Sequence, residues 1–142
     1  MNSMLWTFLY RGMNMPKKGD VFLSYTYQRW GEYNPKRISQ SRTPIPHEVY
    51  LAIPKPDAVN YNIYMSNVGG ANTDYDAYDH NGDFICVLKA QGHSGDFTYA
   101  KQLSGRGNLK ALADWIINNN ITDADTIEIE FLSPTSLKLT KV

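Results

Sequence analysis

The chain has 142 residues, of which 42% are hydrophobic and 20% charged, and its Lys and Arg residues equal its Asp and Glu residues in number. This length suits one domain, residues 1–142, with a core of its own, and the composition excludes a disordered, collagen-like or coiled-coil protein. The single cysteine excludes a disulfide framework, and no apolar run approaches the roughly 20 residues of a membrane span, so we expect a soluble, cytoplasmic protein.

The charges are distributed unevenly along the chain. Residues 1–42 carry seven Lys and Arg against two acids, and residues 89–110 are again basic. The acids gather in residues 74–83 and 123–130. Such segregation can give a neutral protein one positive face.

The first half of the chain reads as strands separated by an irregular basic segment. Residues 19–27 (GDVFLSYTY) are rich in β-branched and aromatic residues, which favours a strand. Residues 29–42 (RWGEYNPKRISQSR) have no hydrophobic period and are predicted to be a loop. Residues 47–54 (HEVYLAIP) alternate as a half-buried strand does, and residues 61–67 are a further strand candidate.

A hairpin and a second long connection are predicted next. In residues 75–90 the pair Asn81-Gly82 is typical of a type I′ turn between two strands. Residues 91–108 contain four glycines with basic and aromatic residues between them, which favours a loop.

The last part of the chain is predicted to be one helix followed by a hairpin. Apolar residues at helical spacing over residues 109–117 predict a helix with Asn108 as its N-cap and with residues 118–120 as its end. Two alternating runs around Ser133-Pro134-Thr135 predict the hairpin. Six or seven strands without βα alternation favour a mainly β (α+β) barrel or sandwich, with a helix plugging an open end.

The sequence gives little indication of a metal-binding site or of a catalytic nucleophile. Three scattered histidines and one cysteine lack zinc spacing, and no cofactor is expected in this domain. The calcium-loop-like run from Asp79 to Asp83 lacks a Glu at its twelfth position, where Ala90 stands. Val87 occupies the place of the acid in a nuclease acid-x-Lys motif, and Cys86 reads as a small core residue.

The basic loops carry the residue types that read DNA. Arginine suits guanine, Asn and Gln suit adenine, Glu and Asp suit cytosine, and Lys and Ser suit phosphates. In the first loop these are Arg29, Glu32, Asn34, Arg37, Gln40 and Arg42 for bases, and Lys36, Ser39 and Ser41 for phosphates. The second loop repeats the mixture with Gln91, His93, Ser94, Asp96, Tyr99, Lys101 and Arg106. We expect the two loops to clamp duplex DNA from one side of the barrel.

Several motifs occur in the order known from one family. They are Trp30-Gly31, the Arg-rich segment ending at Arg42, HEVYLAIP, AYDHNGDFICVLKAQG, Lys101-Gln102-Leu103-Ser104, and the helix leading into a closing hairpin. In these the sequence resembles, over about residues 19–142, the B3-like DNA-binding pseudobarrel of restriction endonucleases. That domain is the N-terminal effector domain of EcoRII-type enzymes and the C-terminal domain of BfiI/NgoFVII-type enzymes.

The resemblance implies an open seven-stranded pseudobarrel with one or two flanking helices. Residues 29–42 would be its first arm and residues 91–106 its second, both laid into the major groove. Arg29, Arg37 and Arg42 would read guanines and Glu32 a cytosine; Lys36, Lys101 and Arg106 would hold phosphates. Trp30 would either anchor the base of the arm or contact DNA, and Glu48 would either contact DNA or support the arm. The family implies a prokaryotic cytoplasm, a fused nuclease domain and magnesium in that nuclease alone.

Two other functions stay open on the sequence. One is an OB-like barrel that binds RNA or single strands by stacking bases on Trp30, Tyr33 and Tyr99. The other is a small magnesium-dependent nuclease or an anti-restriction protein, so whether this chain belongs to an enzyme is undecided.

Overall fold

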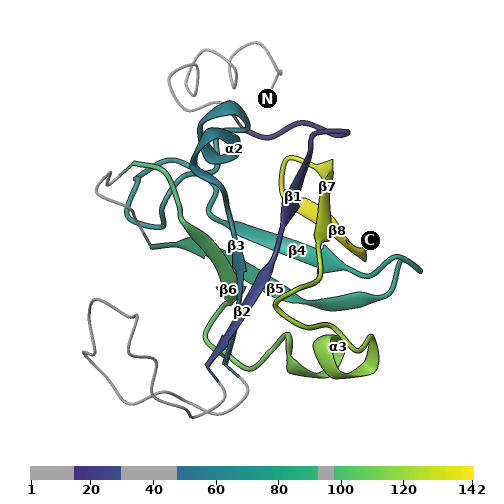
Figure 1. Cartoon of the computed structure of the whole chain (residues 1–142). Coiled ribbons are helices and arrows are strands. Elements are labelled where there is room, and N and C mark those ends of the chain that lie inside the picture. Colours follow the sequence, from purple (N-terminus) through teal and green to yellow (C-terminus); the bar gives the residue numbers. More distant parts are fainter. Residues whose placement is uncertain (1–14, 30–47, 93–97) are drawn as a thin grey trace.

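The computed structural model describes residues 15–29, 48–92 and 98–142 (Figure 1). These ranges form eight strands and two helices. The strands are β1 (Val21–Ser24), β2 (Thr26–Arg29), β3 (Glu48–Ala52), β4 (Asp74–Tyr78), β5 (Phe84–Gln91), β6 (Gln102–Gly105), β7 (Ile127–Ser133) and β8 (Ser136–Lys141), and the helices are α2 (Lys55–Asn60) and α3 (Ala113–Asn118).

The strands form one nearly closed, barrel-like sheet. Their order is β1-β7-β8-β4-β5-β6-β3-β2, so that β1 and β2, which only Tyr25 separates in the chain, lie at the two ends of the order. The Tyr25 carbonyl accepts a hydrogen bond from the Ala52 amide at 2.9 Å, which ties this crossing point to β3. The mainly β pseudobarrel predicted from the sequence is therefore confirmed.

The predicted strand at residues 19–27 is two strands, because its first half pairs with β7 and its second half with β3. The strand therefore changes partner at Tyr25. This division adds one strand to the seven that were predicted, β6 adds another in a segment predicted to be a loop, and the strand predicted at residues 61–67 is absent, so the described residues form eight. It also extends β2 to Arg29, a residue that the sequence pattern places in the loop.

The core fills the barrel and continues under both helices. Its fully buried side chains come from most of the strands and include Leu51, Leu88, Leu103, Ile129 and Leu139. The helices lie at opposite ends of the barrel (Figure 1), where α3 adds Trp115 and Ile116 to the core and α2 adds Ala58. Burying one large aliphatic side chain contributes about 1.5–3 kcal/mol, so this core supplies the main driving force for folding.

Two predictions about the middle of the chain are wrong. Residues 61–67 do not form a strand, and Tyr64 makes only an isolated bridge to Tyr99. Helix α2, which precedes them, was not predicted. The helix ends in a Schellman motif, in which Asn62 has a positive φ of 57° and the Ile63 amide donates to the Ala58 carbonyl at 2.9 Å. The short helix escaped prediction because six residues hold too few apolar positions to show a period.

The strand predicted at residues 47–54 is β3, but it is buried on both faces. Besides Val49 and Leu51, which face the core, Glu48, Tyr50 and Ala52 are only 1%, 5% and 7% exposed. The alternating hydrophobic pattern could not show this, because it indicates that one face of the strand is buried and does not indicate whether other parts of the protein cover the second face.

The predicted hairpins are both present, and the turn type of the first is wrong. Gly82 has a positive φ of 87°, but among the described non-glycine residues only Asn62 and Asn120 do, so Asn81 cannot be in a type I′ turn. Instead the Asp79 carboxylate accepts hydrogen bonds from the amides of Asn81 and Asp83, at 2.8 and 3.0 Å. An Asx-type contact at Asp79 thus shapes a five-residue loop.

Helix α3 begins four residues later than predicted. Residues 109–112 form turns, the N-cap position is held by Leu112, and Asn108 accepts a hydrogen bond from the Lys110 amide at 3.0 Å. The predicted end is correct: Asn120 has a positive φ of 53°, and the Ile121 amide donates to the Ile116 carbonyl. Thus both helices end in the same motif.

Candidate nucleic-acid interface

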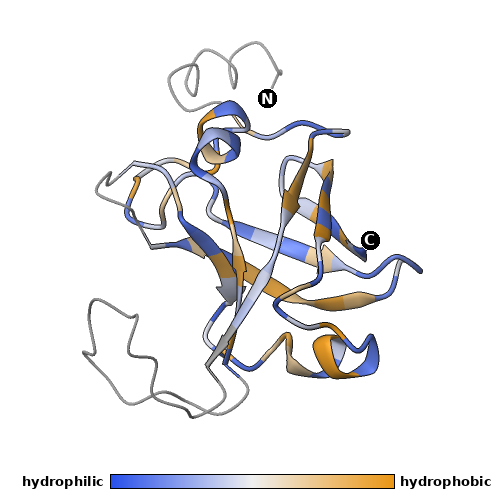
Figure 2. Ribbon diagram, viewed as in Figure 1, coloured by the Kyte–Doolittle hydropathy of each residue, from blue (hydrophilic) through white to orange (hydrophobic). Residues whose placement is uncertain are grey.

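Four neighbouring strands present a polar outer face. Tyr27, Tyr50, Ser104 and Lys89 lie opposite one another in one row across β2, β3, β6 and β5. Their neighbours Leu51, Leu103 and Leu88 are fully buried in the core, and side chains alternate along a strand, so the row lies on the side of the sheet away from the core. Within this row Tyr50 and Ser104 are themselves buried, at 5% and 0% exposed. We call the side chains that β2, β3, β6 and β5 present on this side the outer face. In Figure 2 hydrophilic and hydrophobic colours alternate along the strands of the sheet.

The centre of the outer face is held by side-chain contacts. The rings of Tyr27 and Tyr50 stack at 5.2 Å with an interplanar angle of 16°. The Tyr27 hydroxyl donates to the Gln102 side-chain oxygen, and the Gln91 amide donates to the Ser104 hydroxyl. Because these bonds cross between strands, the floor of the face is already ordered before any partner binds.

Glu48 lies on the same side of β3 as Tyr50. It is 1% exposed and its carboxylate accepts a hydrogen bond from the Tyr50 hydroxyl. Of the two roles that the sequence left for Glu48, this burial favours support of the chain next to the first arm over contact with DNA.

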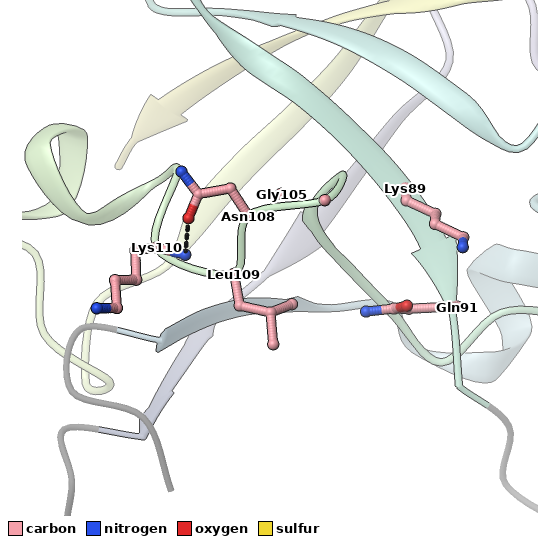
Figure 3. Close-up of a pocket in the computed structure, with 7 residues that line it drawn as sticks. Lys89, Gln91, Gly105, Asn108, Leu109 and Lys110 are labelled. Carbon is pink, nitrogen blue, oxygen red and sulfur yellow. Dashed lines mark hydrogen bonds between the residues drawn. The ribbon is translucent and has the colours of Figure 1, made fainter.

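A hollow of about 380 Å³ opens at one end of the outer face (Figure 3). Lys89 and Gln91 of β5 line it on one side, and the turn after β6 lines it on the other. In Figure 3 Lys89 and Lys110 lie at opposite sides, with Leu109 and Gln91 between them and the Asn108–Lys110 hydrogen bond marked. Two separated cations with an open floor suit an extended anion better than a compact one.

A second hollow of about 250 Å³ lies at the other end of the outer face. It is lined by two tyrosines, a short apolar wall and one cation: Tyr25, Tyr27, Ala52, Ile53, Pro54 and Lys101. Tyr27 belongs to both this hollow and the central stack, which places the two hollows on the same outer face.

The lysines of the two hollows are available for a partner. Within the described residues Lys89, Lys101 and Lys110 form no ion pair. In contrast, Lys138 on β8 pairs with Glu130 at 3.3 Å. A third hollow, of about 360 Å³, contains Asp79, His80 and Asp114 and is therefore unsuited to a polyanion.

The positions of the two arms can be located from the strand ends. Residues 30–47 join Arg29 to Glu48, and β3 runs antiparallel to β6, so that this segment attaches at the Gly105 end of β6. Residues 92–101 join β5 to the Gln102 end of β6. The two attachments therefore border opposite ends of the outer face, and the predicted clamp of both arms on a duplex from one side of the barrel stays a prediction, because the arms lie largely outside the described residues.

The second arm is shorter than predicted. Strand β6 occupies residues 102–105, so that Arg106 lies at the far end of β6 from Lys101. Arg106 also pairs with Asp74 at 3.3 Å, but the Arg106 side chain is 63% and the Asp74 side chain 38% exposed, and such a solvent-accessible pair is weak. Tyr99 stacks on Tyr64 at 5.5 Å. Of the predicted second-arm residues, Gln91 and Lys101 line the hollows.

Most predicted first-arm residues lie outside the described ranges. These are Trp30, Glu32, Tyr33, Asn34, Lys36, Arg37, Ser39, Gln40, Ser41 and Arg42, together with His93, Ser94 and Asp96 of the second arm. Arg29 is described only as the last residue of β2. Their assigned roles stay predictions.

Sequence reasoning missed four residues of the hollows: Tyr25, Tyr27, Lys89 and Lys110. The alternation of Lys89 and Gln91 with Leu88 and Ala90 was a usable signal, because it puts both polar side chains on one outward face. No comparable pattern marks Lys110, whose place depends on the turn after Gly105.

The chemistry of the remaining candidate groups is limited. Burial raises the pKa of the Cys86 thiol to about 11, so at neutral pH it is a thiol and a poor nucleophile. No three His, Cys, Asp or Glu side chains of the described residues come together as a metal site. Neither helix in the described ranges has the length and apolarity to cross a membrane.

No family model, curated protein or solved structure matches the chain.

Proposed function

We propose that this chain is a sequence-specific double-stranded DNA-binding domain of the B3-like type, the target-recognition part of a restriction endonuclease in a prokaryotic cytoplasm. The observation that carries the proposal is the grouping of Lys89, Lys101 and Lys110. These lysines have no acidic partner among the described residues, and they line one outer face whose two ends are the attachment points of the basic arms.

Phosphate contacts position a duplex and base contacts read its sequence. Lys89 and Lys110 stand at two sides of an open floor, as contacts to an extended phosphate backbone require. In this proposal the arginines of the first arm, Arg29, Arg37 and Arg42, reach the base edges, because guanidinium groups pair bidentately with guanine.

The number of described elements supports the proposed type. Counting β1 and β2 as one interrupted strand leaves seven strands and two short helices in residues 15–29, 48–92 and 98–142, and the resemblance implies seven strands with one or two helices. The fused nuclease with its magnesium, and therefore any catalysis, belongs to this proposal and not to the described residues.

A binder of single strands is the competing function, and the half-exposed ring of Tyr25 is the observation in its favour. The other aromatic rings on the outer face are less available: Tyr50 is 5% exposed and Tyr27 is stacked on it. Stacking along a strand needs several free rings.

The test begins with a pool of random duplexes from which bound molecules are recovered and sequenced. We expect one short enriched site and preference for the duplex over either of its strands in competition. A pool that stays random at every salt concentration, or tighter binding of the single strands, refutes the proposal.

A matched pair of variants connects binding to the outer face. Lys89→Gln removes an unpaired lysine from a hollow, and Lys138→Gln removes a partly buried strand lysine that is paired on β8. We expect the first to weaken binding of all duplexes about equally, by several-fold, and the second to leave it unchanged. Equal effects of the two would mean that net charge, not this face, binds DNA.

Cleavage is tested separately by incubating the chain with plasmid and magnesium. Under the proposal the plasmid stays intact, because the nuclease domain is not part of this chain. Nicking that depends on magnesium would favour the alternative of a small nuclease.

A further inference from the structure

The hollow at the Lys101 end of the outer face combines flat aromatic surface with a cation. Tyr25 is 52% exposed and Lys101 is exposed. The ring centroids of Tyr25 and Tyr27 lie 6.3 Å apart with an interplanar angle of 47°, so the rings form an open corner. Ile53 and Pro54 add an apolar wall.

The corner is held at the ring of Tyr27 and at the backbone of Tyr25. Tyr27 is held by its stack on Tyr50 and by the hydrogen bond from its hydroxyl to Gln102. The backbone of Tyr25 is held through its carbonyl, which accepts from the Ala52 amide, and the neighbouring Ser24 hydroxyl donates to the Ala52 carbonyl at 2.6 Å. An aromatic surface fixed in this way loses little conformational entropy when a ring stacks on it.

We propose that this hollow binds one nucleotide of the bound duplex, with its base turned out of the helix against Tyr25 and Tyr27 and its phosphate on Lys101. The inference rests on the proposed duplex binding. A flat apolar corner suits a nucleobase face, and the unpaired cation at its edge suits the phosphate of the same nucleotide. Because the bases of an intact duplex are stacked on each other, only an extruded base can use the tyrosine rings.

The enriched duplex from the selection experiment provides the test. One base at a time is replaced by 2-aminopurine, whose fluorescence rises when it leaves the stack. With the unaltered protein we expect a several-fold rise at one position and little change elsewhere.

Variants then assign that signal to the hollow. Tyr25→Ala should abolish the rise and weaken duplex binding by roughly 5- to 100-fold, the range expected for the loss of one stacked base. Tyr25→Phe keeps the ring and should keep both properties. Phe84→Ala removes an equally exposed ring, 56% exposed, on the β4–β5 hairpin and should change neither.

The outcomes separate this inference from the proposed function. Tight, site-specific duplex binding without a fluorescence rise at any position refutes the inference alone. A rise that persists in Tyr25→Ala also refutes it, since the base would then be held elsewhere. If the protein binds no duplex, both proposals fail.

Discussion

At the scale of single residues, Tyr75 has a buried hydroxyl group that makes no hydrogen bond within the described residues. Its side chain is 1% exposed in the barrel core, and its hydroxyl has no hydrogen-bond partner among the described residues. The ring itself packs well, edge-on against Phe131 with centroids 5.6 Å apart. An unsatisfied buried hydroxyl costs about 1–3 kcal/mol, so this position is less favourable than its packing suggests.

We therefore expect Tyr75→Phe to raise the free energy of unfolding by about 1 kcal/mol at pH 7, measured by urea denaturation. The phenyl ring keeps its packing against Phe131. Tyr78→Phe is the matched control, because Tyr78 is only partly buried and loss of its hydroxyl should have no measurable effect. A destabilised Tyr75→Phe would mean that the hydroxyl has a partner.

The same variant has a pH signature. Burial, and secondarily the charge of Asp74, raises the pKa of Tyr75 above its ordinary value of 10.0. The folded state then holds this proton more tightly than the unfolded state. The contribution of this proton to the free energy of unfolding is therefore complete below pH 10, and it is lost as the pH rises further. The advantage of Tyr75→Phe over the unaltered protein should therefore grow between pH 10 and 12.

Gly105 is a position where the backbone leaves no room for a side chain. An added Cβ would lie 2.0 Å from the Asn108 carbonyl oxygen and 2.6 Å from the Ala111 Cβ. We expect Gly105→Ala to cost about 3 kcal/mol and to disturb the Lys110 side of the hollow, whereas Gly69→Ala, with nothing within 4 Å, should be nearly neutral. Denaturation of both variants, together with duplex binding, checks this.

At the scale of elements, the crossing from β1 to β2 is the connection on which the barrel depends. The Ser24 hydroxyl is buried, 3% of the residue being exposed, and donates to the Ala52 carbonyl where the two ends of the sheet meet. We expect Ser24→Ala to lower the free energy of unfolding by about 1–2 kcal/mol, because the carbonyl loses a buried partner. Urea denaturation measures this, and Leu23→Ala, which changes a neighbouring side chain that is 57% exposed, should matter little.

The same element shows how far sequence reasoning reaches. Alternation and turn residues located both hairpins and the strands on either side of the first arm, because these depend on neighbouring residues. The division at Tyr25 could not be predicted, because it depends on pairing with β7, which is distant in the chain. The two hollows could not be predicted for the same reason. Tyr25 and Lys101 line one hollow, and Lys89 and Lys110 line the other, only after the sheet has formed.

At the scale of the whole molecule, the neutral net charge conceals a division of charge between faces. Lys89, Lys101 and Lys110 line the hollows of the outer face, whereas Asp79 and Asp114 share a hollow beside α3. Such a division orients an approaching polyanion without a net charge on the protein.

We therefore expect duplex binding to weaken steeply with salt. Replacing Lys89, Lys101 and Lys110 together with Gln should reduce the slope of log K against log salt by about 3, because each phosphate that a lysine neutralises adds about 0.9 to that slope. Titrations of the unaltered protein and the triple variant between about 50 and 200 mM salt measure the difference. An unchanged slope in the triple variant would mean that other residues neutralise the phosphates.

The crossing at Tyr25 has one further consequence, for self-association. An exposed sheet edge is a template on which a second chain can add a strand and begin aggregation. In the described part of this barrel the two terminal strands, β1 and β2, are only four residues long each and follow one another directly. In its described part the fold thus offers other copies of itself little backbone to pair with, and we expect the protein to stay unpolymerised through its sheet at high local concentration.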